Sequence, residues 1–192
     1  HHAILNCMKE LETLGFEVTY LQPDELGRIS SDSLKAALRK DTVLVSIMMV
    51  NNETGAVMPI SQMAKLTHRF APDAIFHTDA VQAVGNIKID VNELNIDLLS
   101  MSGHKFHGPK GIGFLYIRKG VKIKSLVHGG GQERKRRAGT ENIPAIVGYG
   151  AASKRAAETM EERTRKEIEV RDYMINKIEA EIPYCRLNGD RT

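Results

Sequence analysis

Four clusters of side chains that could do chemistry occur at the ends of apolar runs. The clusters are residues 51–55 (NNETG), 77–82 (HTDAVQ), 100–111 (SMSGHKFHGPKG) and 128–142 (HGGGQERKRRAGTEN). The apolar runs predict strands, and open parallel sheets bind ligands beyond the carboxyl ends of their strands. We therefore expect these clusters to contribute to one ligand site.

Taken singly, each candidate residue has an ordinary structural explanation. Asp79 could cap the turn that follows its strand. Asn51 and Asn52 could be turn residues. Lys105 could be a surface lysine, and the three glycines at 129–131 could form a flexible loop.

Taken together, the clusters indicate a specific cofactor chemistry. A carboxylate, a lysine and a hydroxyl–imidazole pair suit a cofactor with a basic ring nitrogen, an aldehyde and a phosphate, and pyridoxal 5'-phosphate carries all three. The carboxylate of Asp79 would keep the ring nitrogen protonated. Lys105 would be the amine that attacks the carbonyl, activated by the charges of Arg134, Arg137 and the bound ring.

Further residues beside these two complete the expected pocket. Gln82 falls on the first turn of the helix expected after Asp79, where its amide can reach the ring hydroxyl. Ser102 and His104 can hold phosphate oxygens, with Gly103 letting the backbone approach.

The same motifs resemble those of the cysteine desulfurases, which are pyridoxal-phosphate enzymes of the class V aminotransferase group. The resemblance lies in residues 50–55 (VNNETG), 78–82 (TDAVQ), 102–113 (SGHKFHGPKGIG), 128–134 (HGGGQER) and 137–142 (RAGTEN). It extends over essentially the whole chain. The triple-glycine loop that leads into residues 138–140 favours the desulfurase branch of the group.

This resemblance implies a role for each matching residue. Lys105 would carry the cofactor covalently and move the Cα proton of the substrate. Asp79 would bind the pyridine nitrogen and Gln82 the phenolic oxygen. Asn52 would lie near that oxygen and the substrate.

Four more roles follow from the resemblance. Ser102 and His104 would bind the phosphate, and Thr140 would reach the phosphate of the neighbouring subunit, which implies a homodimer. His1 would stack on the cofactor ring and assist proton transfer. His1 and His2 could otherwise be the remnant of an expression tag.

The activity implied is the removal of sulfur from L-cysteine, giving L-alanine and a protein persulfide. The persulfide sulfur would pass to an iron–sulfur scaffold or another acceptor protein. The family's phosphate loop would precede His1, and its nucleophilic cysteine and the arginine that binds the substrate carboxylate would follow Thr192. We therefore expect a fragment that is inactive alone.

Three alternatives remain open at this point. Selenocysteine lyases and other class V enzymes would share this pocket. A truncated, non-catalytic module could instead bind a partner through its long charged helices. Nucleic-acid binding through residues 134–137 is the weakest option, because the basic run is short and lacks aromatic residues for stacking.

Hydrophobic periodicity predicts the elements that must position these residues. Expected helices cover residues 3–14, 31–39 (capped by Ser31 or Asp32), 59–70 and 91–95, followed by one or two long helices after Pro144; expected strands cover residues 17–21, 43–50, 74–78, 97–101 and 112–117. Such alternation predicts an α/β fold, a mainly parallel sheet with helices on both faces. The resemblance narrows this to part of the large domain of a fold-type I pyridoxal-phosphate transferase.

The resemblance also suggests a domain organisation. Residues 1–150 would form the cofactor-binding large domain, and residues 151–192 a long helical connection toward a small C-terminal domain. The alternating charges of the connection are typical of a solvated helix face.

Composition excludes several other classes of protein. The 192 residues are 42% hydrophobic and 27% charged, with a net charge of +3, which is typical of a globular chain and too small a charge to indicate a nucleic-acid binder. No apolar run is long enough to span a membrane, and no signal peptide is recognised, so we expect a cytoplasmic protein. Cys7 and Cys185 lack metal-ligand spacing, so we expect no metal site and two small buried side chains.

Overall fold

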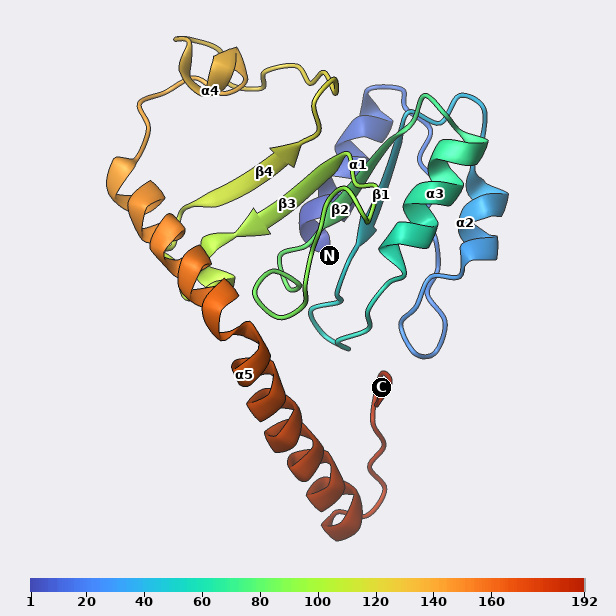
Figure 1. Cartoon of the computed structure of the whole chain (residues 1–192). Helices are drawn as coiled ribbons and strands as arrows, with labels where there is room; N and C mark the ends of the chain where they lie inside the picture. The colour runs from blue at the N-terminus through green and yellow to red at the C-terminus, as the bar shows by residue number, and fades with distance from the viewer. Residues whose placement is uncertain (192) are drawn as a thin grey trace.

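A computed structural model describes residues 1–191, and its centre is a single four-stranded sheet (Figure 1). The strands are β1 (Leu44–Met48), β2 (Ile75–Asp79), β3 (Leu98–Ser102) and β4 (Gly113–Ile117), and they lie side by side in sequence order. The β1–β2 and β2–β3 pairs are parallel, and β4 is antiparallel to β3. The expected α/β fold with a mainly parallel sheet is confirmed.

The core lies between the sheet and α3 (Ile60–Phe70). Phe76 on β2 and Leu99 on β3 are both fully buried in this core. α3 packs against β2, and its buried residues recur at helical spacing: Ile60, Met63, Ala64 and Thr67. This packing fixes the direction in which β2 delivers its last residues.

The two helices that precede the sheet differ in how they are anchored. α2 (Ser31–Ala37) packs on α3 and buries Leu34. Its cap is Ser30, whose Oγ accepts a hydrogen bond from the Ser33 amide, so the expectation of Ser31 or Asp32 is wrong by one residue. α1 (His2–Thr13) has the expected bounds within one residue but buries no side chain.

Two expected elements do not form. Residues 14–30 contain neither helix nor strand, because residues 17–21 pair with no neighbour and β1 is the edge of the sheet. Residues 91–95 form turns rather than a helix. There the carboxylate of Asp90 accepts hydrogen bonds from the amides of Asn92 and Glu93, and Asn95 adopts a left-handed conformation with φ of 57°.

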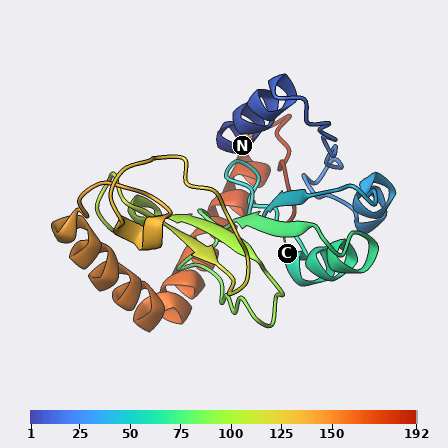
Figure 2. The same ribbon diagram turned by 90° about the horizontal axis from the view of Figure 1, so that it is seen from above.

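The chain after the sheet forms one helix, α5 (Ile143–Glu181), of 39 residues. Figures 1 and 2 show α5 on the β3–β4 side and continuing past the sheet, whereas α2 and α3 lie on the β1 side. Arg163 donates to the carbonyl of Gly85, and Thr164 donates to the carbonyl of Asn86 at 3.1 Å. These bonds tie α5 to the loop after β2. The expected domain boundary at residue 150 falls within α5 and stays a prediction.

The exposed face of α5 carries paired charges at a spacing of four residues. The pairs are Lys154–Glu158, Glu162–Lys166, Arg163–Glu167 and Lys177–Glu181. Such exposed pairs stabilise a helix by only a few tenths of a kcal/mol each, so the face is a solvated one, as expected. No helix within residues 1–191 combines the length and apolar character needed to cross a membrane.

Both cysteines contradict the expectation of burial. Cys7 and Cys185 are exposed free thiols. Cys7 lies on α1, which buries no side chain, and Cys185 lies in the segment after α5, where its Sγ is 3.2 Å from the carbonyl oxygen of Ile182. Neither position has the apolar neighbours that would bury a thiol.

Candidate active site

The ends of the three parallel strands deliver the first three clusters to one edge of the sheet. Met48 is the register partner of Asp79, and Asp79 is the partner of Ser100. The pairing continues one step past β2, where the Ala80 amide donates to the Ser100 carbonyl at 2.9 Å. Loops 49–55, 80–86 and 103–111 therefore leave the sheet side by side, as the sequence predicted.

Asp79 is the buried anion of this edge. It is 6% exposed, and its Oδ1 accepts a hydrogen bond from the Val81 amide at 3.0 Å. Oδ2 has no hydrogen bond to any residue in 1–191. The carboxylate therefore caps the following turn with one oxygen and keeps the other for a ligand, so the structural and the chemical explanations of Asp79 are compatible.

The two asparagines after β1 differ in whether their side chains make hydrogen bonds to the described residues. Oδ1 of Asn51 accepts the amides of Glu53 and Thr54, each at 2.9 Å, and its backbone bonds close the turn to Gly55. The side chain of Asn52 is exposed and makes no hydrogen bond to a described residue. Of the pair, Asn52 is the one available to a ligand.

The segment after β3 forms a short 3-10 helix, η1 (Gly103–Phe106). Oγ of Ser102 lies 2.8 Å from Nδ1 of His104, so the expected hydroxyl–imidazole pair exists in the structure. Lys105 follows on the same turn with an exposed side chain and no hydrogen bond to residues 1–191. The hydroxyl, the imidazole and the amine thus all lie within four consecutive residues, 102–105.

The other side of η1 is packed tightly. Phe106 is buried and meets the ring of Tyr149 on α5 edge-on, with the ring centroids 5.2 Å apart. A Cβ on Gly103 would come within 3.0 Å of that tyrosine ring, so the position requires glycine for packing. The Tyr149 hydroxyl is buried without a partner among the described residues, and burial raises its pKa. This packing holds the turn that presents Lys105.

Gln82 lies on a turn and not on the expected helix. The Ala80 carbonyl accepts the amides of Ala83 and Val84, and the Gln82 carbonyl accepts from the Asn86 side chain at 3.0 Å. These local bonds close the turn before a helix can propagate. The side-chain amide of Gln82 has no hydrogen bond within residues 1–191, and it lies three residues beyond Asp79 at the same edge.

The fourth cluster is carried away from this edge. Because β4 is antiparallel, its carboxyl end lies at the opposite edge of the sheet, and α4 (Gln132–Lys135) lies beyond it at the upper left of Figure 1. Arg134, Arg137 and Thr140 therefore do not contact Lys105, and the expectation that the two arginines activate this amine within one chain is wrong. Thr140 is exposed in the loop after α4.

His1 has a local role in the structure. Its Nδ1 accepts the Ala3 amide at 3.1 Å and so caps α1. Among residues 1–191, the His1 side chain makes no other hydrogen bond. A position over a cofactor ring stays a prediction.

One member of the candidate site was not given a role from the sequence. His77 is 8% exposed on β2, and its ring nitrogens each lie 2.8 Å from a serine hydroxyl, those of Ser46 and Ser100. The sequence does place one polar residue within each of three apolar runs, and these are Ser46, His77 and Ser100. That the three side chains meet depends on the strand register, which the sequence does not show.

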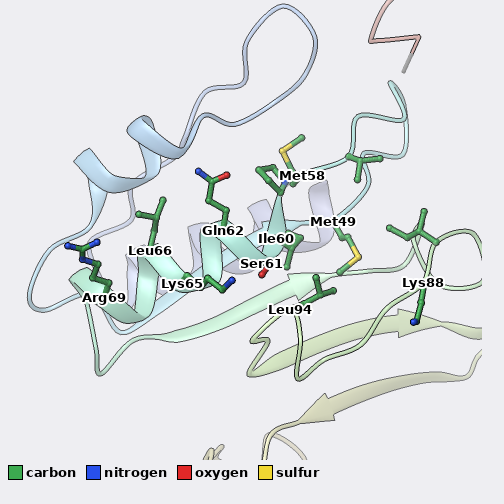
Figure 3. Close-up of a pocket in the computed structure, with 13 residues that line it drawn as sticks. Met49, Met58, Ile60, Ser61, Gln62, Lys65, Leu66, Arg69, Lys88 and Leu94 are labelled. Atoms are coloured by element: carbon green, nitrogen blue, oxygen red, sulfur yellow. The ribbon is translucent and has the colours of Figure 1, made fainter.

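A distinct hollow of the described structure lies elsewhere. A groove of about 630 Å3 runs along α3, lined by apolar side chains such as Met49, Leu66 and Leu94 and bordered by Lys65 and Lys88 (Figure 3). None of the residues expected to bind a cofactor lines it. The candidate residues after β1, β2 and β3, here called the strand-end cluster, therefore lie outside this groove, and the groove does not identify the site.

The strand-end cluster offers three chemically different groups. They are a buried carboxylate with a free oxygen (Asp79), an exposed amine (Lys105) and a hydroxyl–imidazole pair (Ser102 and His104). These match the ring nitrogen, aldehyde and phosphate of pyridoxal phosphate. Residues 1–191 contain no group of three or more His, Cys, Asp or Glu side chains that could hold a metal ion.

Comparison with known proteins shows the family. The aminotransferase class-V family profile matches residues 1–192. The cysteine desulfurase IscS of Methanosarcina thermophila is 54% identical over the whole chain, which covers 47% of that protein. A solved NifS-like protein superposes with a TM-score of 0.91 at 40% identity, over 94% of this chain and 49% of its own.

A second solved structure bears on the ligand. SspA in complex with cysteine is 43% identical, with a TM-score of 0.78, over 87% of this chain and 50% of its own. The chain thus spans about half the length of the relatives it matches. The similarity covers the half that contains the strand-end cluster.

Proposed function

The chain belongs to the aminotransferase class-V family, and on that premise we propose that it is the cofactor-binding part of a pyridoxal-phosphate-dependent cysteine desulfurase. The observation that carries the proposal is the convergence of Asp79 and Lys105 at one sheet edge, fixed by the pairing of Asp79 with Ser100. The IscS and NifS-like names of its relatives and the cysteine complex of SspA support the choice of activity and of L-cysteine as substrate.

The residues present fit this cofactor. Asp79 would bind the protonated ring nitrogen through Oδ2, and Gln82 would donate to the phenolic oxygen. Ser102 and His104 would hold the phosphate, and Asn52 would lie near the phenolic oxygen and the substrate. When bound, pyridoxal phosphate supplies an electron sink for negative charge at the Cα of an amino acid.

Lys105 would perform two tasks. Its amine would hold the cofactor covalently, and as a free amine it would remove the proton from the substrate Cα. The buried charge of Asp79 would keep a proton on the ring nitrogen during this step. His1 would assist the proton transfer, as the resemblance implies.

The sulfur would leave by transfer to a protein thiolate. The thiolate would attack the substrate sulfur, and a sulfur–sulfur bond would form as the carbon–sulfur bond breaks. The electron pair of the broken bond would stay with the substrate carbon, whose protonation gives L-alanine, and the persulfide would stay on the protein. We assign this thiolate to neither Cys7, which lies within α1, nor Cys185, which follows α5, because neither matches the loop that the resemblance implies for the nucleophile. The persulfide would pass to an iron–sulfur scaffold or another acceptor protein.

We also propose a homodimer and a cytoplasmic location. Thr140 is exposed in the loop after α4, and α4 lies away from the carboxyl end of β3 in Figure 1, so this loop would serve the phosphate of the partner subunit. The 1–150 segment would form the large domain, and the remainder would lead to a small domain.

The test uses the full-length protein that contains this chain. Incubation with L-cysteine and pyridoxal phosphate should give equal amounts of L-alanine and protein-bound persulfide, and L-selenocysteine should be the poorer substrate. Absence of alanine in a protein that binds the cofactor would refute the desulfurase activity. Faster alanine release from L-selenocysteine would instead indicate a selenocysteine lyase.

A further inference from the structure

His77 connects all three parallel strands through its imidazole ring. Its Nδ1 lies 2.8 Å from Oγ of Ser46 on β1, and its Nε2 lies 2.8 Å from Oγ of Ser100 on β3. The residue is buried at the middle of β2. Both ring nitrogens therefore have partners where water has little access.

The environment keeps the ring neutral. Burial lowers the pKa of His77, and the nearby charge of Asp79 opposes this shift only in part. β1 and β3 contribute hydroxyl groups to the ring and no charged partner. A neutral imidazole has one N–H donor and one acceptor nitrogen, so one serine accepts from the ring and the other donates to it.

His77 is also coupled to Asp79. The two residues are separated by one position on β2, so their side chains project from the same face of the strand. The charge of Asp79 reaches the ring, since it raises the pKa of His77. Ser100 joins the two, because it binds the His77 ring and is the register partner of Asp79.

We propose that Ser46, His77 and Ser100 form a positioning unit for Asp79, an inference that rests on the proposed role of Asp79 at the cofactor's ring nitrogen. Neutral hydrogen-bonded dipoles beside the carboxylate fix its surroundings without adding a countercharge. The full negative charge of Asp79 then remains for the ring nitrogen. His77 itself touches no reacting atom.

Substitutions at residue 77 separate this role from simple strand tethering. His77→Phe keeps a planar ring and removes both hydrogen bonds, so the half-buried hydroxyls of Ser46 and Ser100 lose their partner on β2. His77→Gln keeps a donor and an acceptor. Thr78→Val is the matched control, because Thr78 is buried next to His77 on the other face of β2 and donates to the Ile47 carbonyl on β1 at 2.8 Å.

The measurement is the pH at which the visible absorbance band of the bound cofactor changes in the full-length protein, together with the cofactor's dissociation constant. We expect His77→Phe to move this pH by roughly one unit and to weaken binding by on the order of tenfold. His77→Gln should restore most of both. Thr78→Val should lower the melting temperature and leave the band unchanged.

The outcomes distinguish the two proposals. A wild-type protein that binds no pyridoxal phosphate would overturn the proposed function. A wild-type protein that binds it, with the same band titration in His77→Phe, would overturn only the role of His77. In the cofactor-free protein, nitrogen NMR should show the pKa of His77 falling further in Asp79→Asn, and an unchanged pKa would also overturn the coupling.

Discussion

Asp79 and Ser100 stand opposite each other on adjacent parallel strands, and the Ala80 amide donates to the Ser100 carbonyl at 2.9 Å. This pairing places the Asp79 carboxylate and the segment that carries the Lys105 amine at the same edge of the sheet. β2 ends on Asp79, whereas β3 runs two residues past Ser100 before η1 presents Lys105. Asp79 and the segment that carries Lys105 therefore leave the sheet at the same edge.

Replacing Lys105 should remove covalent attachment of the cofactor. In the full-length protein, Lys105→Ala should show no borohydride-trapped cofactor and a rate of alanine formation lower by ~10²–10⁴-fold, since the amine is also the proposed base. Lys110→Ala is the control, because Lys110 is an exposed lysine of the same segment. Trapping of cofactor by Lys105→Ala would assign the covalent link to another lysine.

Two substitutions of Asp79 should separate its charge from its turn cap. Asp79→Asn keeps an oxygen for the Val81 amide, so the protein should fold and bind cofactor but lose Cα proton removal by orders of magnitude, because a neutral amide does not hold the ring nitrogen protonated. Asp79→Ala also loses the cap and should be less stable than Asp79→Asn by about 1 kcal/mol. Hydrogen–deuterium exchange at the substrate Cα and urea unfolding measure the two effects. Near-normal exchange in Asp79→Asn would exclude the charge role.

The two asparagines after β1 should respond in opposite ways. Asn51→Ala removes an acceptor of the Glu53 and Thr54 amides and should cost about 1–2 kcal/mol of unfolding free energy. Asn52→Ala should leave stability within about 0.5 kcal/mol, since its side chain is exposed, but should raise the KM for L-cysteine. Denaturant unfolding and steady-state kinetics on both variants test the division. Equal stability of the two variants would contradict the structural role of Asn51.

Local signals predicted much of the fold. The apolar runs gave β1 to β4 within one or two residues, and helical spacing gave α1, α3 and α5. The failures occurred where a neighbour decides the outcome. Residues 17–21 have a strand-like composition, but no strand pairs with them. At residues 91–95 the turn that Asp90 caps ends at Asn95, whose left-handed φ of 57° stops a helix from continuing.

The candidate site was predictable in part for the same reason. Parallel pairing follows from alternating strands and helices, so the convergence of Asp79 and Lys105 could be expected. The antiparallel direction of β4 could not be expected from these patterns. This direction is what separates Arg134 and Thr140 from Lys105. The role of His77 required the register of three strands, which no local pattern encodes.

The buried imidazole of His77 should make stability depend on pH. Its pKa is lowered in the folded state, so below its ordinary value of 6.5 the unfolded chain binds a proton that the folded chain does not, and the free energy of unfolding falls as the pH falls. The loss should begin near pH 6.5 and stop once the pH is below the folded-state pKa. His77→Gln has no proton to bind and should show a smaller decrease between pH 7 and pH 5 in urea unfolding. Thr78→Val is the comparison, because it changes a buried neighbour of His77 that has no titrating group, so the decrease should stay as in the wild type. An identical pH dependence in wild type and His77→Gln would show that the ring is not held neutral.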